Sequence, residues 1–128
     1  MSDSLNGVSI QLLQKSLDAI WLRQQAITNN IANAETPGYK SKKVEFESIL
    51  NDLLSKNYSS AEELEQAIDG IKPKLKESSA ISNSENGNNV VEEEEEIELV
   101  RAQLQYYYLI NSVSSEIDRL KFAINGGQ

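Results

Sequence analysis

The chain has 128 residues, no cysteine, no histidine and a net charge of −8 at pH 7. This length allows one domain at most, and a protein built on long helices need not have a globular centre. Without cysteine the chain forms no disulfides or thiolate sites, and without histidine it lacks the commonest general base and metal ligand. We therefore expect no enzymatic function, no catalytic residue, no metal site and no cofactor.

The charge is unevenly distributed along the chain. Residues 1–43 carry five basic and three acidic side chains, residues 44–96 carry four and fourteen, and residues 97–128 carry three of each. Nucleic acid is not an expected partner, because phosphate binding needs a basic face and none is evident. No apolar run is long enough to predict a membrane-spanning segment, and no leader pattern predicts a cleaved signal peptide.

The first predicted element is a helix over residues 8–33. Its apolar residues recur at alternating spacings of three and four, interrupted only by Gln24, and so form one narrow stripe: Ile10, Leu13, Leu17, Ile20, Ile27, Ile31 and Ala34. Trp21 lies beside this stripe. Such a regular stripe predicts a partner helix, and we expect residues 1–7 to be frayed or to wait for a partner.

The helix is expected to end within a polar segment, which consists of Asn29, Asn30, Ile31, Ala32, Asn33, Ala34, Glu35, Thr36, Pro37, Gly38 and Tyr39. Pro37 disfavours the helical conformation at Thr36, and Gly38 can adopt the positive φ of a type II turn. The three asparagines allow two interpretations. Their amides are either solvated at the helix end, or they bond across an interface or to the turn that follows.

Short elements are predicted between residues 40 and 76. The apolar spacing over residues 46–54 predicts a short helix, and a short extended piece is expected around residues 71–75. A capping box predicts another helix, in which Ser60 accepts from the amide of Glu63 and the Glu63 side chain accepts from the amide of Ser60; Gly70 would end it. The polar run over residues 77–89 predicts a mobile loop or linker.

The last predicted helix begins within residues 90–96 and reaches Ile124. Five consecutive glutamates at its start suit the positive end of a helix dipole. Two apolar seams overlap in it, and we expect a local change of coiled-coil phase between them. One seam holds Ile97, Val100, Leu104 and Tyr107, and the other holds Tyr106, Ile110, Val113, Ile117, Leu120 and Ile124.

Together these elements predict an all-α fold, in which long N- and C-terminal helices form a coiled-coil layer around a middle region of short helices and loops. We expect three segments: a coiled-coil helix over 1–34, a turn, short helices and acidic linker over 35–96, and a coiled-coil helix over 97–128. An intrachain hairpin would bury both stripes for about 20 kcal/mol gross, against an ordering entropy above about 1 kcal/mol per residue. Since such a hairpin is marginal alone, we expect the stripe residues and Trp21 to form an assembly interface with other chains.

Two segments resemble the flagellar basal body rod proteins. RQQAITNNIANAETPGYK, residues 23–40, is similar to the N-terminal signature of that family, and residues 86–124, which begin NGNNVVEEEEE, are similar to its C-terminal pattern. Within the family, the chain is most similar to the proximal, B-type members. It departs from the pattern at Val91, where members often carry Asp, and at Tyr107, where they often carry Gln; the first departure puts the local helix cap in doubt.

The resemblance implies a structural subunit of the rod, the driveshaft that crosses the periplasm. It implies self-association within the rod, and as partners other rod subunits, the rod-to-ring adaptor subunit and the export gate. It also implies that the chain leaves the cytosol unfolded through the flagellar type III export apparatus. A second interpretation is a soluble coiled-coil adaptor or export chaperone that never joins a filament.

Overall fold

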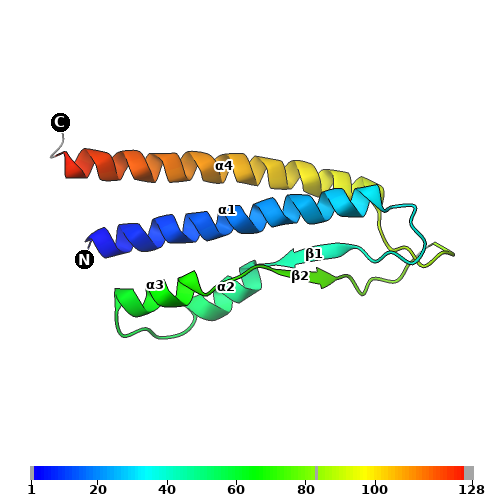
Figure 1. Ribbon diagram of the computed structural model, residues 1–128, viewed down its shortest axis with the longest axis horizontal. Coiled ribbons are helices and arrows are strands. Elements are labelled where there is room, and N and C mark those ends of the chain that lie inside the picture. Colours follow the sequence, from blue (N-terminus) through cyan, green and yellow to red (C-terminus); the bar gives the residue numbers. More distant parts are fainter. Residues whose placement is uncertain (1, 83, 126–128) are drawn as a thin grey trace.

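The computed structural model describes residues 2–82 and 84–125. Within them the helices are α1 (Ser2–Ala32), α2 (Glu47–Leu54), α3 (Ala61–Asp69) and α4 (Glu92–Ile124), and the strands are β1 (Lys42–Glu45) and β2 (Lys74–Glu77). Figure 1 shows three layers, with α4 along one side of α1 and the short elements along the other. The predicted helical fold with two long terminal helices and a short-helix middle is confirmed, and a small two-stranded ribbon is added to it.

The contact between α1 and α4 holds the first part of the core. Ile20 and Ile27 of the predicted α1 stripe are buried against Ala102 of α4. Partly buried apolar side chains pack around these three: Ile31, Leu99, Tyr106 and Leu109. The antiparallel arrangement of the two helices (Figure 1) therefore buries Ile20 and Ile27 of the α1 stripe, and partly buries Ile31, within the chain.

A second face of α1, which the stripe analysis missed, is covered by the middle of the chain. Ala19 is fully buried in a cluster with Phe46 and Ile71. On the same side, the Lys15 ammonium donates to the carbonyl of Asp69 at 2.9 Å and to that of Ile71 at 3.3 Å. The helix α1 is thus the central layer, because it has partners on two sides.

The start of α1 differs from the prediction. The helix begins at Ser2 and includes Gly7, whereas residues 1–7 were expected to be frayed or to wait for a partner; Met1 lies outside the described residues. A glycine inside a helix costs about 1 kcal/mol relative to alanine, which is too little to end a helix of 31 residues.

The capping box of α3 is also only partly as predicted. Ser60 Oγ accepts from the Glu63 amide at 3.1 Å, as expected. The Glu63 carboxylate, however, accepts from the amide and the hydroxyl of Ser59, at 2.8 and 2.5 Å, and not from the amide of Ser60. Ser59 offers two donors to one carboxylate oxygen, so it is the stronger partner. The helix ends before Gly70, as predicted.

The strands β1 and β2 pair antiparallel, with Lys43 opposite Lys76 and Val44 opposite Leu75. Val44 is buried, and its carbonyl accepts from Arg23 of α1 at 3.1 Å. Arg23 also makes a bidentate contact with the Glu47 carboxylate, at 2.8 and 2.9 Å. Side chains of α1 therefore cover the edge of β1 that β2 leaves free.

Candidate assembly interface

An exposed apolar strip runs along α4 on the side away from α1. We call Ile97, Val100, Leu104 and Tyr107 the α4 strip; all four are exposed, Leu104 by 66% and Tyr107 by 69%. The residues that contact α1 are Leu99, Ala102, Tyr106 and Leu109. At 3.6 residues per turn, these two sets fall on opposite sides of one helix.

The predicted change of coiled-coil phase is therefore wrong. Residues 92–124 form one continuous α-helix, and the two predicted seams lie on different faces of it. The seam that contains Tyr106 and Val113 continues the face that contacts α1, while the α4 strip points away from it. Two overlapping apolar patterns in a sequence are compatible with two faces of one helix and also with a change of coiled-coil phase. Only the packing of the helix in the structure distinguishes these two interpretations.

The predicted interface residues divide into two groups. Buried or partly buried are Ile10, Leu13, Leu17, Ile20, Ile27, Ile31, Ala34 and Val113. Exposed are Trp21, Val100, Leu104, Tyr107, Ile110, Ile117 and Ile124; the side chain of Leu120 lies outside the described residues. Sequence reasoning missed exposed Tyr108 and Phe122 as further interface candidates. Tyr106, Tyr107 and Tyr108 are consecutive, and three consecutive residues of a helix cannot all face one partner, so the sequence does carry a signal for Tyr108.

Asn30 is the hub of the turn that follows α1. Its side chain is fully buried and makes four hydrogen bonds. The Nδ2 group donates to the Lys42 carbonyl at 2.9 Å and to the Glu95 carboxylate at 3.0 Å. The Oδ1 atom accepts from the Tyr39 hydroxyl at 3.1 Å and from the Lys42 amide at 2.8 Å. The Asn30 amide thus pairs with both backbone groups of Lys42, as a neighbouring strand would, and it also links α1 to the start of α4.

The prediction of a mobile loop or linker over residues 77–89 agrees with residues 78–82 and 84–89, which form neither helix nor strand, but it missed the structure at both ends of this segment. Residues 74–77 form β2, and Asn88 and Asn89 are buried. Asn88 Nδ2 donates to the carbonyls of Asn33 and Thr36, both at 2.8 Å. The segment has few apolar residues, so we predicted that none of its side chains would be buried. The side-chain amides of Asn88 and Asn89 are nevertheless buried, because they form hydrogen bonds with backbone groups.

Asn89 fixes the same segment to the ribbon. Its Oδ1 accepts from the Ser41 amide at 2.7 Å, and its Nδ2 donates to the carbonyls of Ser78 and Ala80, both at 3.1 Å. We call Asn30, Asn33, Asn88 and Asn89 the asparagine cluster. It joins the two segments that carry the family resemblance, residues 23–40 and 86–124, at one end of the helix pair.

The turn at Pro37 and Gly38 is as predicted. Gly38 has a φ of +74°, and the Tyr39 amide donates to the Thr36 carbonyl at 3.2 Å, as in a type II turn. The Gly38 amide donates to the Asn86 carbonyl at 2.8 Å, so this turn too contacts the segment before α4. Of the three motif asparagines, Asn30 and Asn33 bond to the turn, while Asn29 is exposed.

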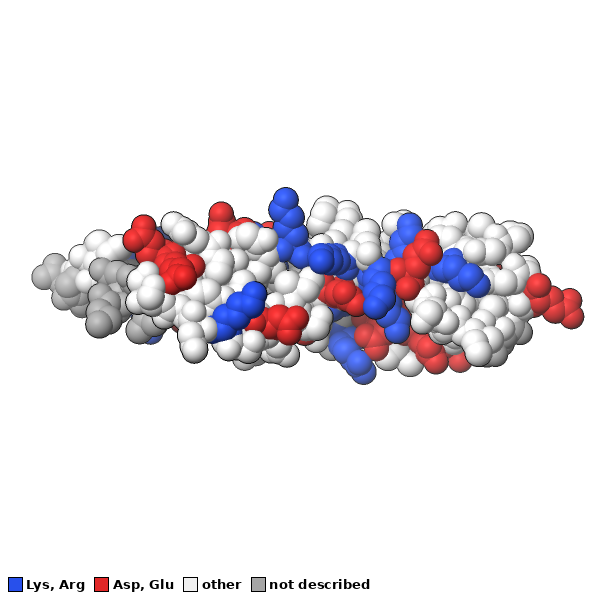
Figure 2. Space-filling view, turned by 90° about the horizontal axis from the view of Figure 1, so that it is seen from below, with Lys and Arg blue, Asp and Glu red and all other residues white. Residues whose placement is uncertain are grey.

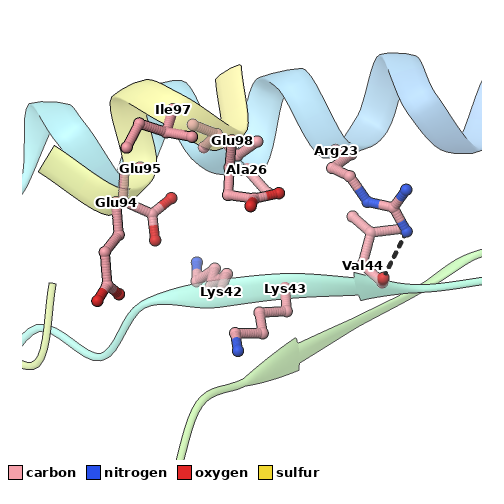
Figure 3. A pocket seen from close by; sticks show the side chains of 10 residues that line it. Arg23, Ala26, Lys42, Lys43, Val44, Glu94, Glu95, Ile97 and Glu98 are labelled. Atoms are coloured by element: carbon pink, nitrogen blue, oxygen red, sulfur yellow. Dashed lines mark hydrogen bonds between the residues drawn. The ribbon is translucent and has the colours of Figure 1, made fainter. Parts of the chain in front are cut away.

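A groove between α1, α4 and β1 holds charges of both signs (Figure 3). Glu94, Glu95 and Glu98 of α4 line it opposite Lys42 and Lys43 of β1. Desolvation raises the pKa of Glu95 above its ordinary value, an effect opposed by the bond from Asn30 and by the charge of Lys43. Burial likewise raises the pKa of Tyr39, with the nearby charges of Glu95 and Glu77 acting in the same direction.

This arrangement offers contact surfaces and a rigid turn. Within residues 2–82 and 84–125, no group of three carboxylates gathers where it could hold a metal ion. Over the same residues, no helix has the length and apolar character needed to cross a bilayer.

Comparison with known proteins identifies relatives over nearly the whole chain. The family described as flagella basal body rod protein matches residues 17–40. The flagellar basal body rod protein FlgB of Bacillus subtilis is 33% identical, over 98% of this chain and 99% of its own length. The FlgB proteins of Borreliella burgdorferi (34% identical, 80% of this chain and 85% of theirs) and Buchnera aphidicola (29%, 88% and 91%) are also similar.

Proposed function

The chain belongs to the flagellar basal body rod protein FlgB family and is a structural subunit of the rod, and we propose on that premise that it polymerises through the exposed faces of α1 and α4 to transmit torque across the periplasm. The observation that carries this proposal is the α4 strip. Four large apolar side chains in one line on a helix that already has a partner on its other face favour a second partner.

The free energy available from the α4 strip is substantial. Burying one large apolar side chain contributes about 1.5 to 3 kcal/mol, so the four strip residues contribute about 6 kcal/mol or more before the costs of association. Trp21, 54% exposed on α1, adds a further aromatic contact. Close-packed side chains at such contacts resist sliding, which is the property that a rotating rod requires.

The division of labour within the chain follows the predicted segments. Residues 1–34 and 97–128 form the helical layer of the rod, and residues 35–96 lie outside that layer. The asparagine cluster supports this division, because it fixes where the chain leaves α1 and where it enters α4. The turn thereby sets the orientation of the middle region relative to both helices.

The partners proposed are other rod subunits, further copies of this chain, the rod-to-ring adaptor subunit and the export gate. The chain reaches the periplasm unfolded, through the flagellar type III export apparatus. Its subunit architecture suits this route, because α1 and α4 come from opposite ends of the sequence and pack together only once both have been exported.

The test is the location of the chain in the cell. We expect it in isolated basal bodies at a fixed number of copies, and a deletion strain should be non-motile and lack the rod beyond the point where this subunit joins. The soluble adaptor or chaperone alternative predicts the opposite: the chain would sediment as a stable dimer in cytosolic extract and would be absent from basal bodies.

A further inference from the structure

Two faces on opposite sides of the molecule differ in charge. On α4, the first three residues of the strip (Ile97, Val100 and Leu104) are flanked by Glu93 and Glu96, and all five side chains are exposed. Among the described residues, no basic side chain forms an ion pair with Glu93 or Glu96. This side of α4 is therefore apolar along its centre. Glu93 and Glu96 lie at its margin, and so does Arg101, whose guanidinium is paired with Glu98.

The ribbon carries the opposite charge on the other side of α1. Val44 is buried, and side chains alternate along a strand, so the pairs formed by Lys43 with Lys76 and by Glu45 with Lys74 face away from Val44. We call Lys43, Lys74 and Lys76 the lysine face. Figure 2 shows basic side chains over the middle of this face, with acidic side chains among them.

The lysine face is only partly neutralised within the chain. Glu45 pairs with the Lys76 ammonium at 3.2 Å, and it is the single ion pair on the ribbon among the described residues. Lys43 and Lys76 stand directly opposite each other, an arrangement of like charges that destabilises a strand pair. Carboxylates from another molecule would relieve this repulsion.

We propose that the first three residues of the α4 strip of one subunit dock on the lysine face of a second copy of this chain. Lysine stems are apolar and would cover Ile97, Val100 and Leu104, while their ammonium groups reach Glu93 and Glu96. The sizes agree: residues 97–104 of a helix span about 10 Å. A four-residue strand spans about 13 Å.

The position of the two faces determines the kind of assembly. The α4 strip lies on the outer side of one layer and the ribbon in the opposite layer, with α1 between them (Figure 1). Such a contact joins different surfaces of two copies, so each added copy presents a free face to the next, as open helical assemblies require. The inference rests on the proposed function and specifies which surfaces of neighbouring copies meet.

Disulfide cross-linking tests the contact directly, because the natural chain has no cysteine. The double variant E96C with K76C should give disulfide-linked dimers and longer ladders when isolated basal bodies are oxidised. The control variant E96C with Gln66→Cys, which moves the second cysteine to an exposed position on α3, should give none. A chain that is present in basal bodies but forms no ladder overturns this contact and leaves the proposed function standing; a chain absent from basal bodies overturns both.

Charge exchange provides a second, independent readout. Reversing Lys74 and Lys76 to Glu, or Glu93 and Glu96 to Lys, should each lower the copies per basal body about tenfold or more, since 1.4 kcal/mol per contact already changes binding tenfold. Combining all four changes in one chain should restore incorporation, and the control Lys56→Glu, on an exposed residue after α2, should leave it unchanged. Normal incorporation of either reversed pair, or failure of the fourfold exchange to restore it in a chain with unchanged circular dichroism, would overturn the proposal.

Discussion

Replacing Asn30 by alanine removes all four hydrogen bonds of a fully buried side chain. The Lys42 amide and carbonyl lose their partners in a part-buried site, and each buried group left unpaired costs about 1 to 3 kcal/mol. The Tyr39 hydroxyl and the Glu95 carboxylate, which are part-buried as well, also lose a partner. We therefore expect Asn30→Ala to lower the free energy of unfolding by about 3 kcal/mol.

Urea unfolding followed by circular dichroism measures this loss. With a slope of about 1.5 kcal/mol per molar urea, the midpoint should fall by about 2 M. The control is Asn29→Ala, one residue earlier on the same helix and exposed, which should stay within about 0.5 kcal/mol of the natural chain. Equal stability of the two variants would refute the account of Asn30 as the hub of the turn.

Three further perturbations test separate parts of the structure. The pKa of Glu95 is raised in the folded state, so the ionised carboxylate destabilises the folded chain. The stability gained by Glu95→Gln should therefore grow as pH rises from 4.5 through the raised pKa. A gain that shrinks with rising pH in urea melts would contradict the assigned cause. Gly38→Ala should cost about 1 to 2 kcal/mol by thermal melting, through backbone strain alone, since φ is +74° and a Cβ there meets open space; a neutral substitution would argue against the type II turn. Ser60→Ala removes the helix cap on the Glu63 amide and should cost about 1 kcal/mol, and no change in the melt would mean that the cap is replaced by water.

Periodicity was sufficient to predict the long helices and the face of α1 that packs on α4. The stripe from Ile10 to Ile31 repeats strictly, and a narrow apolar face on a long helix has few alternatives to a helical partner. The turn at Pro37 and Gly38 was equally readable, because each of these residues restricts the backbone in its own way.

The second face of α1 gave no such signal. It consists of Ala19, Ala26 and Asn30 among polar neighbours, so its apolar content is low, and its burial depends on what the middle of the chain brings to it. Small side chains allow close approach of helix and ribbon, but smallness alone does not predict contact. This is why the position of the ribbon was not foreseen, although the extended piece expected around residues 71–75 overlaps β2.

Asparagine-rich segments were the hardest to interpret. An amide carries donor and acceptor groups that suit water and a buried network equally well, so composition gave a mobile loop where Asn88 and Asn89 are buried. The same ambiguity left Asn29, Asn30 and Asn33 undecided. Only the backbone geometry of the turn shows that Asn30 meets both groups of Lys42.

The packing of α1 against α4 also determines which substitutions can test assembly without unfolding the subunit. Ile31 belongs to the core between α1 and α4, so Ile31→Asp would damage the subunit itself and would not separate folding from polymerisation. Leu104, by contrast, is 66% exposed, and its replacement leaves that core intact. Substitutions on the α4 strip therefore test assembly without a folding defect.

The central claim is tested most directly by counting Leu104→Asp subunits in isolated basal bodies, with Gln103→Asp, an exposed neighbour on another face of α4, as the matched control. We expect Leu104→Asp to retain the circular dichroism spectrum and melting temperature of the natural chain and to be absent from basal bodies, while Gln103→Asp incorporates normally. Incorporation of Leu104→Asp at the natural level, with full motility, would contradict the assignment of the α4 strip as an assembly surface.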